Sequence, residues 1–184
     1  RGQLARLLDE RGALAARHGV RVSFHHHTNV PFETYAETAE LLAATDPRHV
    51  HLFCDSGHAT KDFVEFPPAR RALELLVRHW DRVAYIEFKD WCAATEFATE
   101  LGRGDADLRP VVDLIIERAY PGWIVLEQNA PSAGSTAGAS AARSLRFARD
   151  LFASASASAS ASASASASAS SAPKRPSSAA ASQR

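Results

Sequence analysis

The chain has 184 residues with 21 basic and 21 acidic side chains, and residues 1–152 carry 18 basic against 21 acidic, a balance of −3 that argues against a nucleic-acid-binding protein. It contains no apolar run of membrane-spanning length and only two cysteines, so we expect a cytoplasmic protein without membrane partners or a disulfide framework. Residues 153–184 alternate Ala and Ser before a short basic tip, and because they lack large apolar side chains we expect a disordered low-complexity tail.

Residues 1–152 alternate between helical and strand-like hydrophobic patterns. A helix is predicted first, near residues 4–15, with His18-Gly19 as its C-terminal stop. Four strand–helix units follow, with strands predicted at 20–25, 49–55, 83–88 and 123–127 and helices at 31–46, 67–80, 111–119 and 145–152. Strands joined by helical crossovers run parallel. The order therefore predicts an α/β domain, a partial TIM barrel that contains the C-terminal half of a (β/α)8 barrel, units 5–8.

A small open doubly wound sheet has the same alternation of strands and helices. Its nucleotide-binding members place a Gly-rich turn after the first strand, whereas this chain has His25-His26-His27 there. Periodicity alone favours the half-barrel only slightly, so the choice depends on the residues at the strand ends.

Each predicted strand has one apolar face and, on the other, an ionisable side chain near its C-terminal end. These four residues are His25, Asp55, Glu87 and Glu127. In parallel barrels the active site lies at that end. Three carboxylates brought together repel one another, so we predict a bound divalent cation, Mn²⁺, Co²⁺ or Mg²⁺, with Zn²⁺ also possible. Each acid alone could instead be a solvated strand end or a helix cap, but the shared parity of all four favours a metal site.

Three further residues, His27, His58 and Lys89, are predicted to contact the substrate. His27 shares a strand face with the first predicted ligand, whereas His26 points the other way and is interpreted as a packing residue. His58 either reaches the site or stabilises its loop. Lys89 either pairs with an acidic ligand or holds a substrate oxygen.

Four segments in order resemble the xylose isomerase-like barrel superfamily and, within it, the inosose dehydratases. They are Phe24-His-His-His-Thr28, Cys54-Asp-Ser-Gly-His58, Tyr85-Ile-Glu-Phe-Lys-Asp90 and Gly122-Trp-Ile-Val-Leu-Glu-Gln128, and Gly102-Arg-Gly-Asp105 is similar to the family's Gly-x-Gly loop. The likeness extends over residues 20–152. It discriminates poorly between dehydratases, isomerases and epimerases.

The resemblance implies the metal ligands His25, Asp55, Glu87 and Glu127, with His27, His58 and Lys89 near the substrate. One departure is Glu87, which stands where the family commonly has a ligand histidine. The other is the absence of the first four barrel strands.

The activity implied is that of a metal-dependent carbon–oxygen lyase of inositol catabolism, which takes a proton next to the ketone of a keto-cyclitol and then eliminates water. His27 or a carboxylate would be the base, and His58 or Lys89 the acid. The alternatives are a sugar isomerase or epimerase, an endonuclease of the same superfamily, which the charge of −3 disfavours, and an inactive half-barrel whose free sheet edges would promote homo-oligomers.

Overall fold

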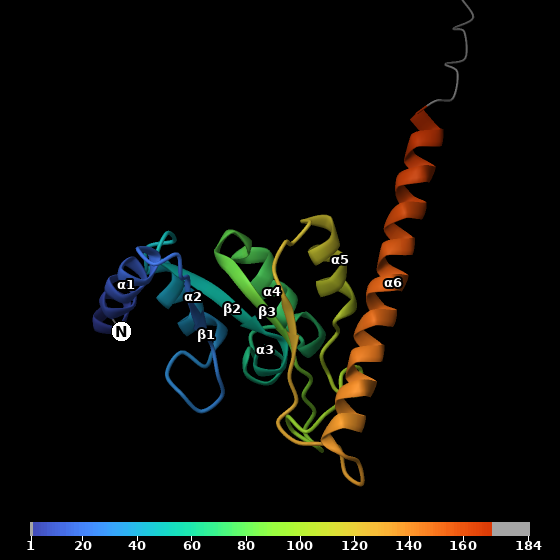
Figure 1. Ribbon diagram of the computed structural model, residues 1–184, viewed down its shortest axis with the longest axis horizontal. Coiled ribbons are helices and arrows are strands. Elements are labelled where there is room, and N and C mark those ends of the chain that lie inside the picture. Colours follow the sequence, from blue (N-terminus) through green and yellow to red (C-terminus); the bar gives the residue numbers. More distant parts are fainter. Residues whose placement is uncertain (1, 171–184) are drawn as a thin grey trace, which may run out of the picture.

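A single parallel sheet is the centre of the computed structural model, which describes residues 2–170, with side chains described as far as residue 162 (Figure 1). Its strands lie in the order of the chain: β1 (Val22–His25), β2 (Val50–Asp55), β3 (Val83–Phe88) and β4 (Ile124–Leu126). The helices are α1 (Gly2–Ala16), α2 (Tyr35–Ala43), α3 (Ser56–Asp62), α4 (Arg71–Arg78), α5 (Arg109–Glu117) and α6 (Ala137–Ser170), with short 3-10 turns at Pro68–Arg70 and Trp80–Arg82. The predicted parallel α/β architecture is therefore confirmed.

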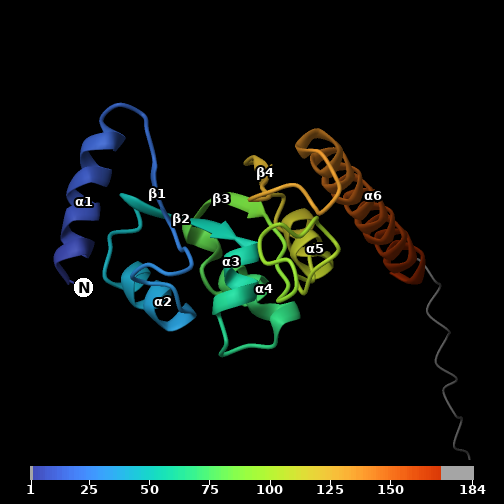
Figure 2. The ribbon, with the colours of Figure 1, turned by 90° about the horizontal axis from the view of Figure 1, so that it is seen from below.

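The hydrophobic core lies between the sheet and the helices on one of its faces (Figure 2). Leu52, Ile86 and Phe88 point into this core and are almost fully buried. Leu75 and Val112 reach them from α4 and α5 and are equally buried. The apolar parity of the predicted strands thus marks the helix-covered face of the sheet.

The register of the sheet aligns the strand ends that carry polar residues. His25 pairs with Phe53 across β1 and β2, and Asp55 pairs with Glu87 across β2 and β3. Glu87 in turn pairs with Val125 of β4. The C-terminal ends of all four strands consequently meet at one end of the sheet, as expected for a segment of a parallel barrel.

Helix α3 was not predicted. Its seven residues begin directly after β2, where the side chain of Asp55 accepts hydrogen bonds from the backbone N–H groups of Gly57 and His58. The segment is short and its residues are buried on nearly all sides, so it shows no amphipathic period. The cap, rather than the hydrophobic pattern, identifies this helix.

Disorder was predicted for residues 153–184, but residues 153–170 continue α6 as a helix, so the prediction is corrected for this part. Ala has the strongest helix propensity, and a helix already nucleated by packing extends without a new nucleation cost. Ala155 is buried against the core, and the Oγ atoms of Ser154 and Ser158 lie 3.4 and 3.3 Å from the guanidinium nitrogens of Arg109. Residues 171–184 lie outside the described part of the chain. The proposed division into a domain, residues 1–152, and a tail stays a prediction.

No helix of the described residues covers the second face of the sheet (Figure 2). Phe53, Tyr85 and Val125, which point to this face, are only partly buried. Within residues 2–170, β1 and β4 each pair with one neighbouring strand. No helix among these residues is both long and apolar enough to cross a membrane.

Candidate metal and substrate site

Asp55 is the centre of the polar cluster at the strand ends. It is completely buried, and its Oδ1 is occupied by the two N–H groups of the α3 cap, at 2.7 and 3.0 Å. Its Oδ2 lies 3.3 Å from His25 Nε2, 3.5 Å from His58 Nε2 and 3.9 Å from Lys89 Nζ. Burial opposes ionisation, but the hydrogen bond with His25 and the charges around it hold the pKa of Asp55 well below its usual range. Asp55 is therefore an ionised carboxylate with one oxygen directed into the cluster.

His25, Asp55 and His58 form a group whose ligand atoms all lie within 4.8 Å of one another, which is close enough to hold a metal ion. Two of these residues belong to the predicted ligand set, whereas His58 was predicted to contact substrate. Burial lowers the pKa of His58 to about 3, so its imidazole is neutral at pH 7 and offers a lone pair. Neutral imidazole and carboxylate are the donors that many divalent ions accept.

Glu87 lies beside Asp55 and is buried, with 3% of its surface exposed. It is in hydrogen-bonding contact with Asp55 and Glu127, and burial together with these two carboxyl groups raises its pKa to about 9. Its Oε1 is buried without a hydrogen-bond partner. The three acids therefore lie next to one another, and their proximity favours the protonated form of Glu87.

Lys89 is buried at 1% exposure and supplies the positive charge of the cluster. Its Nζ lies 2.7 Å from Glu127 Oε1, 3.4 Å from His58 Nε2 and 5.0 Å from the ring centre of Phe97. A Cβ at Gly57 would lie 2.7 Å from the Lys89 Cγ, so glycine is needed there for α3 to pass over the lysine. Of the two roles predicted for Lys89, pairing with an acidic residue is the one present in the structure.

His27 is exposed at the mouth of the cluster, and its ring lies 3.9 Å from the ring of His58, centre to centre. Its Nδ1 is 2.9 Å from the Thr28 carbonyl oxygen, to which it donates a hydrogen bond. The neutral ring then has its lone pair on Nε2. His26 points the other way, is buried against Phe63 and packs as interpreted from the sequence.

Thr28 and Asp62 are buried polar residues of the site that the sequence analysis missed. The Thr28 hydroxyl lies 2.5 Å from Asp62 Oδ2 and 2.8 Å from His58 Nδ1. Asp62 is one helical turn after His58, so recognition of α3 as a helix would have placed both residues on the same side of it. These residues were missed because helix α3 was not predicted from the sequence.

The long segment between β3 and α5 is organised by Asp90. This buried carboxylate accepts hydrogen bonds from the backbone N–H groups of Gly102, Gly104 and Ala106. A Cβ at Gly104 would lie 2.2 Å from Asp90 Oδ1, which explains the second glycine of the Gly-x-Gly loop. The loop thus closes over one carboxylate and keeps Phe97 against Lys89.

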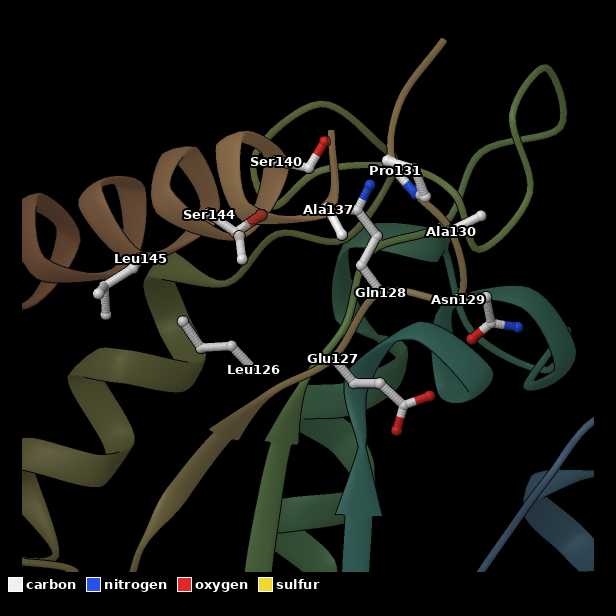
Figure 3. A pocket seen from close by; sticks show the side chains of 11 residues that line it. Leu126, Glu127, Gln128, Asn129, Ala130, Pro131, Ala137, Ser140, Ser144 and Leu145 are labelled. Carbon is white, nitrogen blue, oxygen red and sulfur yellow. The ribbon is translucent and has the colours of Figure 1, made fainter. Parts of the chain in front are cut away.

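A cavity of about 500 Å³ lies next to the cluster, between the end of β4 and the first turns of α6 (Figure 3). In this view Leu126 and Glu127 point in opposite directions from the strand end. The cavity wall is mostly apolar and includes Leu126, Ala137 and Leu145. Glu127 therefore borders both this cavity and the polar cluster.

Comparison with known proteins gives a family match over nearly the whole described chain. Residues 1–151 match the family model described as xylose isomerase-like TIM barrel. The inosose dehydratase of Lactiplantibacillus plantarum is 34% identical over 137 residues, which cover 65% of this chain and 44% of that protein. The inosose dehydratase of Salmonella agona is 31% identical over the same length and with the same coverage. The chain thus spans less than half the length of the curated relatives it matches.

Two solved structures with the same fold are a sugar epimerase and a protein described as epimerase-like. A D-tagatose 3-epimerase-like protein superposes with a TM-score of 0.65 at 17% identity, covering 83% of this chain and 54% of that one. The 3-keto-D-glucoside 4-epimerase from E. coli superposes with a TM-score of 0.60 at 20% identity, with 81% and 52% coverage. At these identities the likeness shows the barrel fold of the matched half.

Proposed function

Because the chain belongs to the xylose isomerase-like TIM barrel family, we propose that it carries the metal-binding and substrate-binding half of a keto-cyclitol dehydratase site. The observation that supports this most directly is the meeting of four side chains, one from each strand end, with buried Lys89 beside two of the acids: His25, Asp55, Glu87 and Glu127. Relatives about 30% identical are named inosose dehydratase, which supports this substrate class over others.

The donor set fits a divalent cation such as Mn²⁺, Co²⁺, Mg²⁺ or Zn²⁺. His25, Asp55 and His58 would hold it, and the predicted ligands Glu87 and Glu127 would complete an oxygen-rich set. The buried Glu87 Oε1 without a partner supports the proposal, because a cation would satisfy it and release the proton from that carboxyl group. A bound cation would supply Lewis-acid stabilisation of negative charge on the ketone oxygen.

The chain's own residues would bind the substrate and move its protons. His27, with its lone pair on an exposed Nε2, is the proposed base for the proton next to the ketone. Lys89, charged and held by Glu127, would donate to the departing hydroxyl. The expectation that His58 acts as the acid is replaced in this proposal, because its imidazole is neutral and offers a lone pair.

Metal binding is the first test. We expect the wild-type chain to bind one Mn²⁺ and Asp55→Asn to lose at least about 100-fold in affinity, because the substitution removes the negative charge from the side chain that contacts both imidazoles. Isothermal titration calorimetry measures both values. Asp113→Asn is the matched control, since Asp113 pairs with Arg109 on the surface of α5. No Mn²⁺ uptake by the wild-type chain would remove the metal from the proposal.

The reaction is the second test. Dehydration of a keto-cyclitol gives a conjugated product that absorbs in the ultraviolet, whereas isomerisation or epimerisation of a sugar does not. A metal-loaded chain that converts inosose with a rise in absorbance supports the lyase, and conversion of sugars without it supports the isomerase or epimerase alternative. Metal uptake without any turnover would indicate an inactive half-barrel.

The proposed partners are a small sugar or cyclitol and, on the open sheet face, a second polypeptide such as another copy in a homo-oligomer. Both cysteines, Cys54 and Cys92, are unpaired in the structure. Free thiols are typical of reducing compartments, so a cytoplasmic location stays part of the proposal.

A further inference from the structure

A buried hydrogen-bond chain extends behind the metal site from Asp62 through Thr28 to His58. Thr28 and Asp62 are 7% and 9% exposed, and His58 is 1% exposed. The Thr28 hydroxyl donates to Asp62 Oδ2 at 2.5 Å, and the same oxygen lies 2.8 Å from His58 Nδ1. Neither Thr28 nor Asp62 belongs to the group of possible ligands formed by His25, Asp55 and His58, and both are linked to that group through the His58 imidazole.

The proton count of this chain favours one tautomer of His58 as long as Asp62 accepts the hydroxyl hydrogen. A threonine hydroxyl has one hydrogen, and here the carboxylate takes it. The oxygen can then only accept from Nδ1, so Nδ1 carries the ring hydrogen. In a neutral imidazole the lone pair must therefore be on Nε2, the atom that lies 3.5 Å from Asp55 Oδ2 and 3.4 Å from Lys89 Nζ.

A second contact favours the opposite tautomer. The backbone N–H of Thr28 is directed at His58 Nδ1 and donates to it at 3.3 Å, a hydrogen bond that requires the lone pair on Nδ1. That contact is longer than the 2.8 Å contact between the Thr28 hydroxyl and Nδ1. If Nδ1 carried the lone pair, the hydroxyl would have to turn its hydrogen toward Nδ1, and its hydrogen bond to Asp62 would be lost. The balance between the two depends on whether Asp62 holds the hydroxyl hydrogen.

We propose that Asp62 and Thr28 are positioning residues that hold His58 as its Nδ1–H tautomer and so direct the Nε2 lone pair at the cation site. The inference rests on the metal site proposed above. Metal-ligating histidines generally donate their second N–H to an acceptor that fixes the ring, and loss of that acceptor costs about 10- to 100-fold in metal affinity. Here the acceptor is a threonine hydroxyl polarised by a buried carboxylate.

The tautomer is measurable without any metal. In ¹⁵N-histidine-labelled, metal-free wild-type chain, His58 should show a protonated Nδ1 and an unprotonated Nε2 in two-dimensional NMR. Thr28→Val removes the acceptor and leaves only the backbone donor facing Nδ1, so it should move the hydrogen to Nε2. Asp62→Leu frees the hydroxyl hydrogen to turn toward Nδ1 and should do the same. Thr28→Ser keeps the hydroxyl and should keep the wild-type tautomer.

Mn²⁺ affinity gives the second readout. Thr28→Val and Asp62→Leu should each weaken binding about 10- to 100-fold, while Thr28→Ser stays within about threefold of wild type. Thr60→Val is the matched control, because Thr60 is also a buried threonine and its hydroxyl donates to the Ser56 carbonyl oxygen instead of bonding with the His58 ring. Its affinity should stay at the wild-type value.

The outcomes separate the positioning role from the metal site. An Nε2–H tautomer in the wild-type chain overturns the inference whether or not Mn²⁺ binds, and an Nδ1–H tautomer supports it even if Mn²⁺ does not bind. Affinity loss in Thr60→Val equal to that in Thr28→Val would also overturn it, because the effect would then be structural. If a variant fails to fold, the wild-type spectrum and Thr28→Ser still decide.

Discussion

His26 supports the site from behind and has to stay neutral to do so. Its Nε2 accepts the backbone N–H of Asp55 at 3.3 Å, so the ring hydrogen is on Nδ1, which is buried without a partner. Burial lowers the pKa of His26 to about 4 from its usual 6.5. A second proton on this ring would remove the acceptor that holds the Asp55 backbone.

This makes the folded chain sensitive to acid. As pH falls below 6.5, His26 binds a proton in the unfolded state, whereas in the folded state it binds one only near pH 4. The stabilisation that is present above pH 6.5 is therefore lost between pH 6.5 and about 4. At pH 5.5 the loss from this group is about 1 kcal/mol. His26→Gln, which cannot titrate, should therefore lose about 1 kcal/mol less than wild type between pH 7.5 and 5.5 in urea unfolding. His18→Gln, at an exposed position after α1, is the control, and an unchanged pH slope in His26→Gln would contradict the prediction.

Helix α6 shows how a helix that packs on the core can continue into a segment, residues 153–170, whose sequence would not form a helix alone. Its far end extends well beyond the rest of the fold (Figure 1). Ala155 packs into the core, whereas Ala157 on the same helix is exposed. The sequence past residue 152 therefore contributes at least one core contact.

Two substitutions test this contribution. Ala155→Asp places a charge in the core and should lower the free energy of unfolding by about 2 kcal/mol or more. Ala157→Asp makes the same change at an exposed position and should stay within about 0.5 kcal/mol of wild type. Chemical denaturation followed by circular dichroism measures both. Equal effects of the two would mean that residues beyond 152 do not pack on the folded domain.

The strands and their parity could be predicted because alternation and helix spacing are local properties of the chain. The position of Asp55 and Glu87 at neighbouring strand ends follows from parity and parallel order alone. The position of His58 cannot be derived in this way, because it depends on α3, a buried helix without an amphipathic pattern. Pairing with an acidic ligand was one of the two roles predicted for Lys89, but the choice of Glu127 as its partner depends on side-chain directions across two strands and could not be predicted.

The whole molecule exposes a sheet face that barrel proteins bury. The rings of Phe53 and Tyr85 meet edge to face on this side of the sheet with their centres 4.6 Å apart, and both are only partly buried. The chain corresponds to about half of the barrel proteins on which it superposes. Free edges and an uncovered apolar face favour association with another polypeptide.

We therefore expect the 184-residue chain to self-associate, with a mass by multi-angle light scattering that rises above 19.8 kDa as concentration increases. Tyr85→Lys places a charge on the open face and should shift the chain toward the monomer, because burying that ammonium in an interface without a partner is costly. Val77→Lys makes a comparable change on the outer side of α4, where Val77 is 51% exposed, and should leave the association unchanged. A constant mass of 19.8 kDa, or equal shifts from both variants, would show that the open face is not where copies of the chain meet.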